Sequence, residues 1–77
     1  MANETEKLIM LAKNIGRFRK SLNLSQNEFA EKLNISREHL AKLETAKRCI
    51  SLKLLFKMCE MFNFKESDLF NFENFEN

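Results

Sequence analysis

The most constraining feature of this sequence is a pair of short amphipathic segments separated by only three residues. Residues 26–33 and 37–45 each repeat apolar side chains at three- and four-residue steps, and a serine that can cap a helix precedes each segment. Between them lie Asn34, Ile35 and Ser36, and asparagine tolerates the left-handed conformation that ends a helix. So short a connection predicts two helices joined by a tight turn, a helix-turn-helix unit over about residues 26–44.

The same apolar periodicity extends this unit into a small all-helical domain. Further helices are expected over residues 4–22, 52–62 and 66–70, with short connections and no strand. The inner side of the expected fourth helix is formed by Leu52, Leu55, Met58 or Cys59, and Phe62. We therefore expect an all-α, compact five-helix bundle spanning residues 1–77 as a single domain. Residues 71–77 are expected to be a flexible tail or part of a dimer interface.

Composition excludes several other classes of protein. Hydrophobic residues make up 44% of the chain and charged residues 31%, which is typical of a globular domain, and no apolar run reaches the roughly 20 residues that span a bilayer. The first ten residues lack the basic-then-apolar order of a secretory signal, so a cytoplasmic protein without membrane contact is expected. Cys49 and Cys59 form no disulfide framework and are interpreted as small buried or half-buried apolar side chains in a reducing compartment.

The charge is distributed unevenly along the chain. Residues 1–48 hold ten Lys and Arg against six Asp and Glu, whereas residues 49–77 hold three against five. This asymmetry favours a basic surface toward a polyanion, with the acidic end directed away from it, although many ordinary domains show as much.

The start of the second short helix explains how such a surface could recognise DNA. Leu40 and Leu43 anchor this helix to the core, which leaves Arg37, Glu38 and Lys42 directed outward. In a helix-turn-helix unit, the N-terminal residues of the second helix contact base edges in the major groove. Arg37 fits the two acceptors of guanine, Glu38 can accept from cytosine or support Arg37, and Lys42 can contact guanine or phosphate. The alternative is that these are ordinary solvated surface charges.

At this point the sequence resembles the Xre/Cro-type DNA-binding domain of lambdoid phage repressors and many bacterial regulators. The resemblance covers about residues 15–70 and rests on the successive motifs LSQ, FAEKL, ISR followed by LAKLE, SLKLL and DLF. The sequence departs from the family where glycine, proline or a serine cap is usual. The departures from glycine are Asn23, Asn34, Asn63 and Ala46, that from proline is Ile50, and that from the serine cap is Lys65.

The resemblance implies a role for each matching position. Residues implied to contact bases are Ser36, Arg37, Glu38 and Lys42. Residues implied to contact the DNA backbone are Gln26, Thr45, Lys47 and Arg48. His39, the single histidine, either contacts a phosphate or has no role, because it has no second ligand or nucleophile for metal binding or catalysis. Arg19 and Glu44 match a partly buried ion pair between the first and third helices.

Proteins of this type usually bind DNA as pairs, because one recognition helix contacts only a few base pairs. Side chains that could form a homodimer interface are Leu54, Phe56, Met61, Phe70, Phe72 and Phe75. The alternative is that several of them cover the core of their own chain. RNA polymerase is a further expected partner if the protein activates transcription, with Glu44 as the candidate contact unless it is committed to Arg19. No cofactor, metal ion or small-molecule ligand is expected.

Two classes of function follow. The first is a sequence-specific regulator of transcription that binds a pseudo-palindromic operator as a homodimer, similar to restriction–modification controller proteins or small phage repressors. The second is an antitoxin-like interaction module, whose Phe-rich acidic tail would fold against a protein partner. An enzyme is not expected, since no carboxylate pair, glycine-rich phosphate loop, metal cluster or Cys–His pairing occurs at usable spacing.

Overall fold

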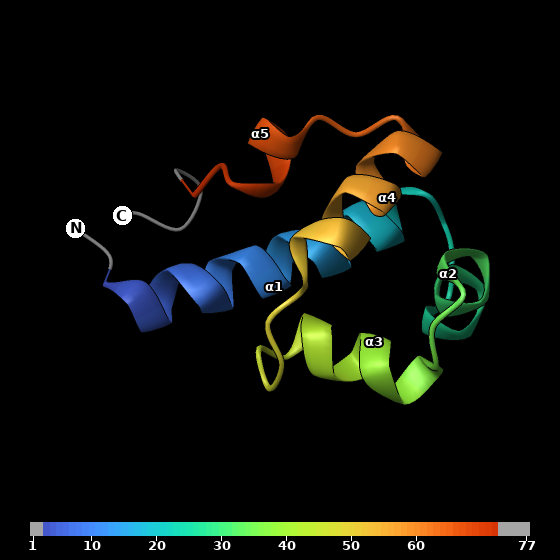
Figure 1. The fold of residues 1–77 in the computed structure, drawn as a ribbon, viewed down its shortest axis with the longest axis horizontal. Coiled ribbons are helices and arrows are strands. Elements are labelled where there is room, and N and C mark those ends of the chain that lie inside the picture. Colours follow the sequence, from blue (N-terminus) through green and yellow to red (C-terminus); the bar gives the residue numbers. More distant parts are fainter. Residues whose placement is uncertain (1–2, 73–77) are drawn as a thin grey trace.

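The computed structural model describes residues 3–72, which fold into helices only (Figure 1). The helices are α1 (Glu4–Ser21), α2 (Gln26–Leu33), α3 (Arg37–Glu44), α4 (Leu52–Phe62) and α5 (Glu66–Leu69). The predicted all-α architecture and helix order are confirmed. α1, α3 and α5 each end one residue earlier than predicted, because the final apolar or polar residue of each segment is the C-cap rather than a helical residue.

Four of these helices begin at the side-chain caps that the sequence indicates. Asn3 and Ser25 form complete capping boxes with Glu6 and Glu28, and each box satisfies two backbone donors at the helix start. Ser51 caps α4 by accepting a hydrogen bond from the Leu54 backbone N–H at 3.1 Å. The hydrogen bond that the Ser25 backbone N–H donates to Glu28 holds the pKa of this carboxyl below its usual 4.5.

Left-handed backbone residues end the helices and turn the chain. The φ angles of Asn23, Asn34, Ala46 and Asn63 are 59°, 59°, 61° and 58°. Asparagine tolerates this conformation, so three of the four replacements for glycine preserve the turn at small cost. Ala46 has a Cβ and no side-chain hydrogen bond to compensate, so its left-handed conformation is a local source of strain.

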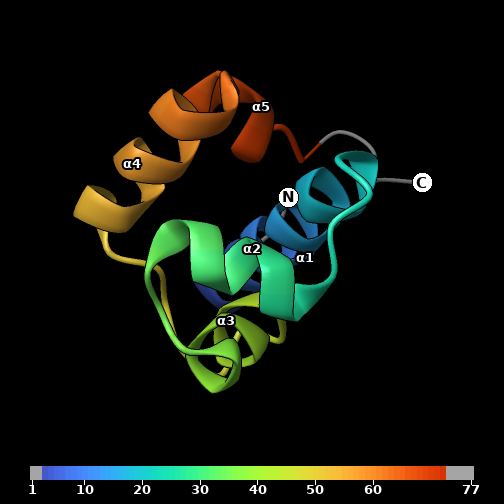
Figure 2. The ribbon, with the colours of Figure 1, turned by 90° about the vertical axis from the view of Figure 1, so that its right-hand side faces the viewer.

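The core forms where the five helices converge, as the two ribbon views show (Figures 1 and 2). Its fully buried large side chains come from every helix: Phe29, Ile15, Leu33, Leu40, Leu43, Leu55, Met58 and Leu69. Leu52 was expected on the inner side of α4 but is 65% exposed, so this prediction was wrong. Ile50, two residues earlier, is 8% exposed and fills the core at this end of α4 instead.

Three long-range hydrogen bonds, from two side chains, fix the outer helices. The buried Asn14 side chain of α1 donates to the backbone carbonyls of Leu69 and Asn71, at 2.9 and 3.0 Å, and so ties α5 to α1. Lys57 of α4 donates from Nζ to the Leu33 carbonyl at the end of α2, at 2.9 Å. The carbonyl groups at a helix C-terminus carry partial negative charge, so an ammonium group is a favourable partner there.

The cysteines differ in environment, and residues 3–72 contain no membrane-spanning candidate. Both thiols are free; Cys59 is buried as expected, whereas Cys49 lies exposed in the loop between α3 and α4, contrary to expectation. No helix in the described range is both long and apolar enough to cross a bilayer.

Candidate nucleic-acid interface

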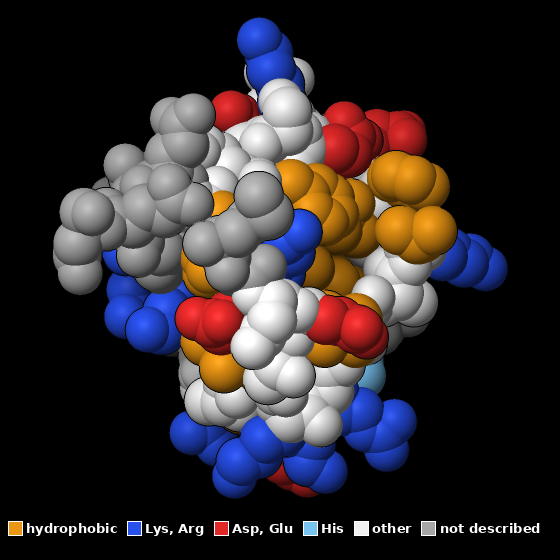
Figure 3. Space-filling view, turned by 90° about the vertical axis from the view of Figure 1, so that its left-hand side faces the viewer, with side chains coloured by type: hydrophobic (Ala, Val, Ile, Leu, Met, Phe, Trp, Pro, Cys, Tyr) orange, Lys and Arg blue, Asp and Glu red, His pale blue; other side chains and the backbone are white. Residues whose placement is uncertain are grey.

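α3 lies at one end of the molecule, opposite α5, and its outer side is free of other elements (Figure 1). Leu40 and Leu43 are 0% and 1% exposed and hold this helix against the core. Arg37, Glu38 and Lys42 are all exposed, as the positions of the two leucines require. Figure 3 shows Lys and Arg side chains gathered at the same end of the molecule, around a smaller acidic patch.

Backbone and capping hydrogen bonds fix the turn before α3. The backbone N–H groups of Asn34 and Ile35 donate to carbonyls in the last turn of α2, and the Ile35 side chain packs against the core. Ser36 then caps α3, its hydroxyl oxygen accepting from the His39 backbone N–H at 3.0 Å. The free backbone N–H groups at this end of α3 carry partial positive charge, which favours a phosphate nearby.

The loop after α3 folds back onto the helix that it leaves. The backbone N–H groups of Lys47 and Arg48 both donate to the Lys42 carbonyl, at 3.0 and 3.2 Å. The Thr45 hydroxyl donates to the Ala41 carbonyl at 2.8 Å, so its hydrogen is not available to a phosphate in this structure. This loop therefore presents Lys47 and Arg48 as exposed cations on a fixed backbone.

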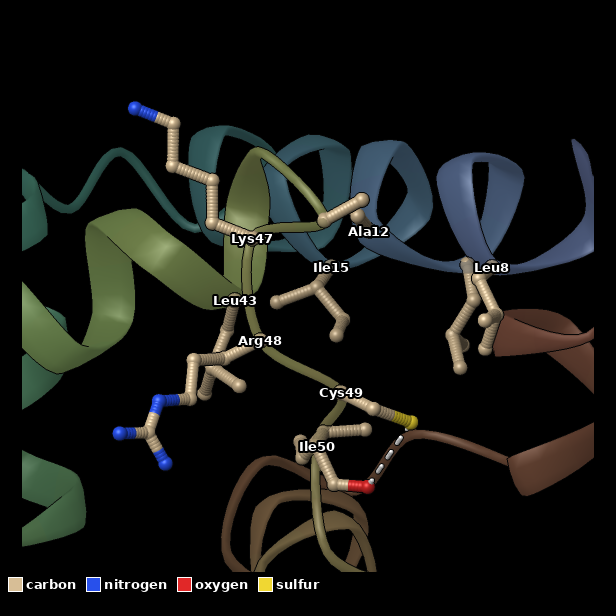
Figure 4. Close-up of a pocket in the computed structure, with 10 residues that line it drawn as sticks. Leu8, Ala12, Ile15, Leu43, Lys47, Arg48, Cys49 and Ile50 are labelled. Atoms are coloured by element: carbon tan, nitrogen blue, oxygen red, sulfur yellow. Dashed lines mark hydrogen bonds between the residues drawn. The ribbon is translucent and has the colours of Figure 1, made fainter. Parts of the chain in front are cut away.

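Figure 4 shows the other side of this loop. A cavity of about 90 Å³ lies between α1 and the loop, with Leu8, Ala12, Ile15 and Leu43 among its walls. The Lys47 and Arg48 side chains extend away from it toward solvent, and the Cys49 thiol lies beside the Ile50 carbonyl. The cavity walls are mostly apolar, so this space belongs to the packing of the loop rather than to a polar ligand site.

A charged network joins α1, α2 and α3 behind the exposed surface. Arg19 and Glu44 form the ion pair that the family resemblance implied, with Nε to Oε2 at 2.8 Å and Nη2 to Oε1 at 3.1 Å. The Gln26 side chain donates to the same Oε1 at 3.1 Å. A Cβ built at Gly16 would lie 3.4 Å from Glu44 Oε1, an ordinary van der Waals contact, so the position of Glu44 does not require glycine there.

This network alters two expectations for site residues. Glu44 was the candidate contact for RNA polymerase unless it was paired with Arg19; its side chain is 8% exposed and both oxygens are engaged, so it is not available. Gln26 was expected at the DNA backbone, and its amide is already oriented by Glu44. The two residues lie 18 positions apart, so no local pattern indicates this contact.

The expected dimer residues divide into three groups. Phe56, Met61 and Phe70 are 51%, 46% and 45% exposed. Leu54 and Phe72 are partly buried against the core of their own chain, which is the alternative that the sequence left open. Phe75 lies outside the described residues. Leu52, not among the expected residues, is the most exposed large hydrophobic side chain of the described range.

Metal coordination finds no support in residues 3–72, where no three His, Cys, Asp or Glu side chains lie close enough to hold an ion. The α3 surface offers exposed cations, one acidic side chain and backbone N–H groups at a capped helix start, which are groups suited to recognition of a polyanion.

Comparisons with known proteins agree with this geometry. A helix-turn-helix family model matches residues 15–69. An uncharacterized HTH-type transcriptional regulator of Archaeoglobus fulgidus is 39% identical over 62 residues, which cover 80% of this chain and 87% of the relative. An uncharacterized HTH-type transcriptional regulator of Methanocaldococcus jannaschii is 41% identical over 54 residues, covering 70% and 82%. Antitoxin PezA of Streptococcus pneumoniae is 37% identical over 60 residues, covering 78% of this chain but 38% of that protein.

Proposed function

Because this chain belongs to the Xre-type helix-turn-helix family of DNA-binding transcription regulators, we propose that it binds a pseudo-palindromic operator as a homodimer and regulates transcription by occupying it. The supporting observation is the contrast within α3. Its leucines are completely buried, whereas the polar side chains at its capped start are exposed together. A helix that is held this way can enter the major groove without disturbing the core.

In this proposal, residues at the start and outer side of α3 select the sequence. Arg37 donates to the O6 and N7 atoms of a guanine, a bidentate contact worth about 1–3 kcal/mol of discrimination. Glu38 accepts from a cytosine amino group or holds Arg37 in position, and Lys42 contacts guanine or phosphate. Ser36 already accepts the capping hydrogen bond, so its hydroxyl hydrogen is the group left for DNA.

The remaining contacts set affinity and register. Lys47 and Arg48 neutralise phosphates from their fixed loop, and Gln26 donates its second amide hydrogen to a phosphate while Glu44 holds the first. His39 and Thr45 contribute less, because His39 is half-buried and the Thr45 hydroxyl is engaged with Ala41. None of these contacts requires a cofactor, a metal ion or an enzymatic step.

Two matched variants separate base recognition from phosphate contact. Arg37→Ala and Lys47→Ala each remove one positive charge from the same end of the molecule. Fluorescence anisotropy with operator and scrambled duplexes, over a series of salt concentrations, measures both effects. We expect Arg37→Ala to lose about 1–3 kcal/mol on the operator alone, and Lys47→Ala to weaken both duplexes equally with a salt slope lower by about one. Retention of full sequence preference by Arg37→Ala would show that the base-contact assignment is wrong.

A second candidate function is binding to a protein partner, as the match to an antitoxin suggests. The regulator proposal is favoured, because the two archaeal relatives are covered over more than four-fifths of their length and the antitoxin over 38%. Sequence-specific DNA binding by the purified chain alone would support the first candidate. Binding that requires a second protein would support the other.

A further inference from the structure

The outer side of α4 is the largest apolar feature that the DNA-binding surface does not use. Of the six exposed large hydrophobic side chains in the described range, three belong to this helix: Leu52, Phe56 and Met61. Phe56 and Met61 line a shallow depression together with Lys53, Lys57 and Glu60. Figure 3 shows hydrophobic side chains exposed above the basic end of the molecule, on the side where α4 lies.

The charges at the ends of α4 are the reverse of what its own dipole favours. Of the five helices in residues 3–72, α4 alone has neither an acid in its first turn nor a base in its last. Lys57 lies in the middle of α4 and is held by the Leu33 carbonyl, whereas the other exposed charges of the helix are Lys53 in the first turn and Glu60 near the end. A cation near a helix N-terminus and an anion near a C-terminus are each mildly destabilising. These two side chains also form no ion pair within the described part of the chain.

An antiparallel copy of the same helix reverses this disadvantage. Lys53 and Glu60 are seven residues, or two helical turns, apart, so they project from one side of α4. A two-fold axis between positions 56 and 57 places Lys53 beside Glu60 of the second copy, and Glu60 beside its Lys53. Each charge then lies next to both an opposite charge and the favourable end of the neighbouring helix dipole.

One apolar side chain fits the same register. Phe56 meets its counterpart at the axis, beside the aliphatic part of Lys57, whereas Leu52 and Met61 lie at the two opposite edges of this surface. The Lys57 ammonium group is already held by the Leu33 carbonyl, so its stem is left to pack. α3 lies below α4 in both ribbon views (Figures 1 and 2), so α4 can pair with a second copy without covering α3.

From these observations we infer that the protein dimerises by antiparallel pairing of α4 with α4 of a second copy, with reciprocal Lys53–Glu60 ion pairs. The inference rests on the proposed homodimeric operator binding and specifies its interface. The order of Lys53 and Glu60 along α4, rather than apolar area alone, then determines which helices pair and in which direction.

Charge-reversal variants test the register directly. Lys53→Glu places two acids on each α4, and Glu60→Lys places two bases there, so both variants replace two attractions in the dimer with two repulsions. We expect the dimer dissociation constant of each variant, measured by sedimentation equilibrium, to be at least about tenfold higher than that of the wild-type protein. An equimolar mixture of the two should recover wild-type association, because every cross-pair is again attractive. Lys32→Glu reverses an exposed charge on α2; it is the control and should leave association unchanged.

The variants also separate this inference from failure to fold and from failure of the proposed function. Both reversals give α4 a charge that its dipole favours, so circular dichroism of dilute samples should show an undiminished helical fold. If the wild-type protein dimerises and neither reversal weakens it, the α4 pairing is overturned while dimeric operator binding stands. If the wild-type protein stays monomeric both free and on DNA, the homodimer itself is overturned, and this interface with it.

Discussion

The Glu44 carboxylate is the most informative position at which to perturb this fold. It accepts hydrogen bonds from Arg19 and Gln26, and thereby joins three helices at the base of the recognition helix. Glu44→Ala leaves the Arg19 guanidinium, whose side chain is 11% exposed, with only its Nη1 hydrogen bond to the Leu24 carbonyl. A buried charge without its counter-ion is strongly destabilising.

The expected loss of unfolding free energy on Glu44→Ala follows from these contacts. Removing one partner of a buried ion pair costs about 3–5 kcal/mol, and the lower end applies here because Arg19 keeps one hydrogen bond and lies near solvent. A chain of this length has a total free energy of unfolding of about 4–12 kcal/mol. Glu44→Ala should therefore remove a large part of the stability and leave the protein marginally folded.

Urea denaturation followed by far-UV circular dichroism, at constant protein concentration, measures this loss of stability. With a slope of about 1 kcal/mol per molar urea, a loss of 3 kcal/mol moves the midpoint by roughly 3 M. Glu38→Ala, an exposed acid on the same helix, is the matched control and should change stability by less than about 0.5 kcal/mol.

The double substitution Arg19→Met with Glu44→Leu completes the test. It removes both charges and refills the space, so it should cost less than Glu44→Ala alone, by about 2 kcal/mol. If Glu44→Ala cost no more stability than Glu38→Ala, or if the double substitution cost more than Glu44→Ala, the Arg19–Glu44 pair would not stabilise the fold in this way.

Three further predictions concern single positions. Ala46→Gly should stabilise the protein by about 0.5–1 kcal/mol, because glycine adopts the left-handed conformation without strain, and a lower urea midpoint would contradict this. Lys65→Ser should stabilise α5 by about 0.5–1 kcal/mol, because Lys65 makes no side-chain cap, and unchanged thermal unfolding would show that the cap is irrelevant. Iodoacetamide at mildly alkaline pH should alkylate the exposed Cys49 and spare the buried Cys59. Burial, and to a smaller extent the nearby Glu66 and Asp68 carboxylates, raise the pKa of the Cys59 thiol and so lower its reactivity. Equal labelling of the two cysteines in mass spectrometry would contradict the burial of Cys59.

The helix starts and the helix-turn-helix unit could be predicted because their determinants are local. A serine or asparagine cap acts within three residues, and the spacing of Leu40 and Leu43 alone decides that Arg37 points outward. Three left-handed turns were predictable for the same reason, since asparagine tolerates them. Ala46 gives no such signal; its conformation accompanies the two loop amides that converge on the Lys42 carbonyl.

Contacts between distant segments could not be predicted from periodicity. Leu52, Leu54, Leu55 and Phe56 place apolar side chains all around the first turns of α4, so the pattern does not reveal which of them is buried. Leu54 packs inward and Leu52 is exposed because Ile50 fills the core at this end. The Gln26–Glu44 hydrogen bond likewise depends on how three helices pack, which no single segment encodes.

Selection from a random duplex library measures whether α3 of a dimeric protein selects a DNA sequence. The wild-type protein and Arg37→Ala should be carried through the same rounds of selection. We expect an enriched two-fold-symmetric site, with half-sites about 10 base pairs apart or a multiple of one turn, that is lost with Arg37→Ala. No enrichment by folded wild-type protein would contradict sequence-specific recognition and favour a protein partner instead.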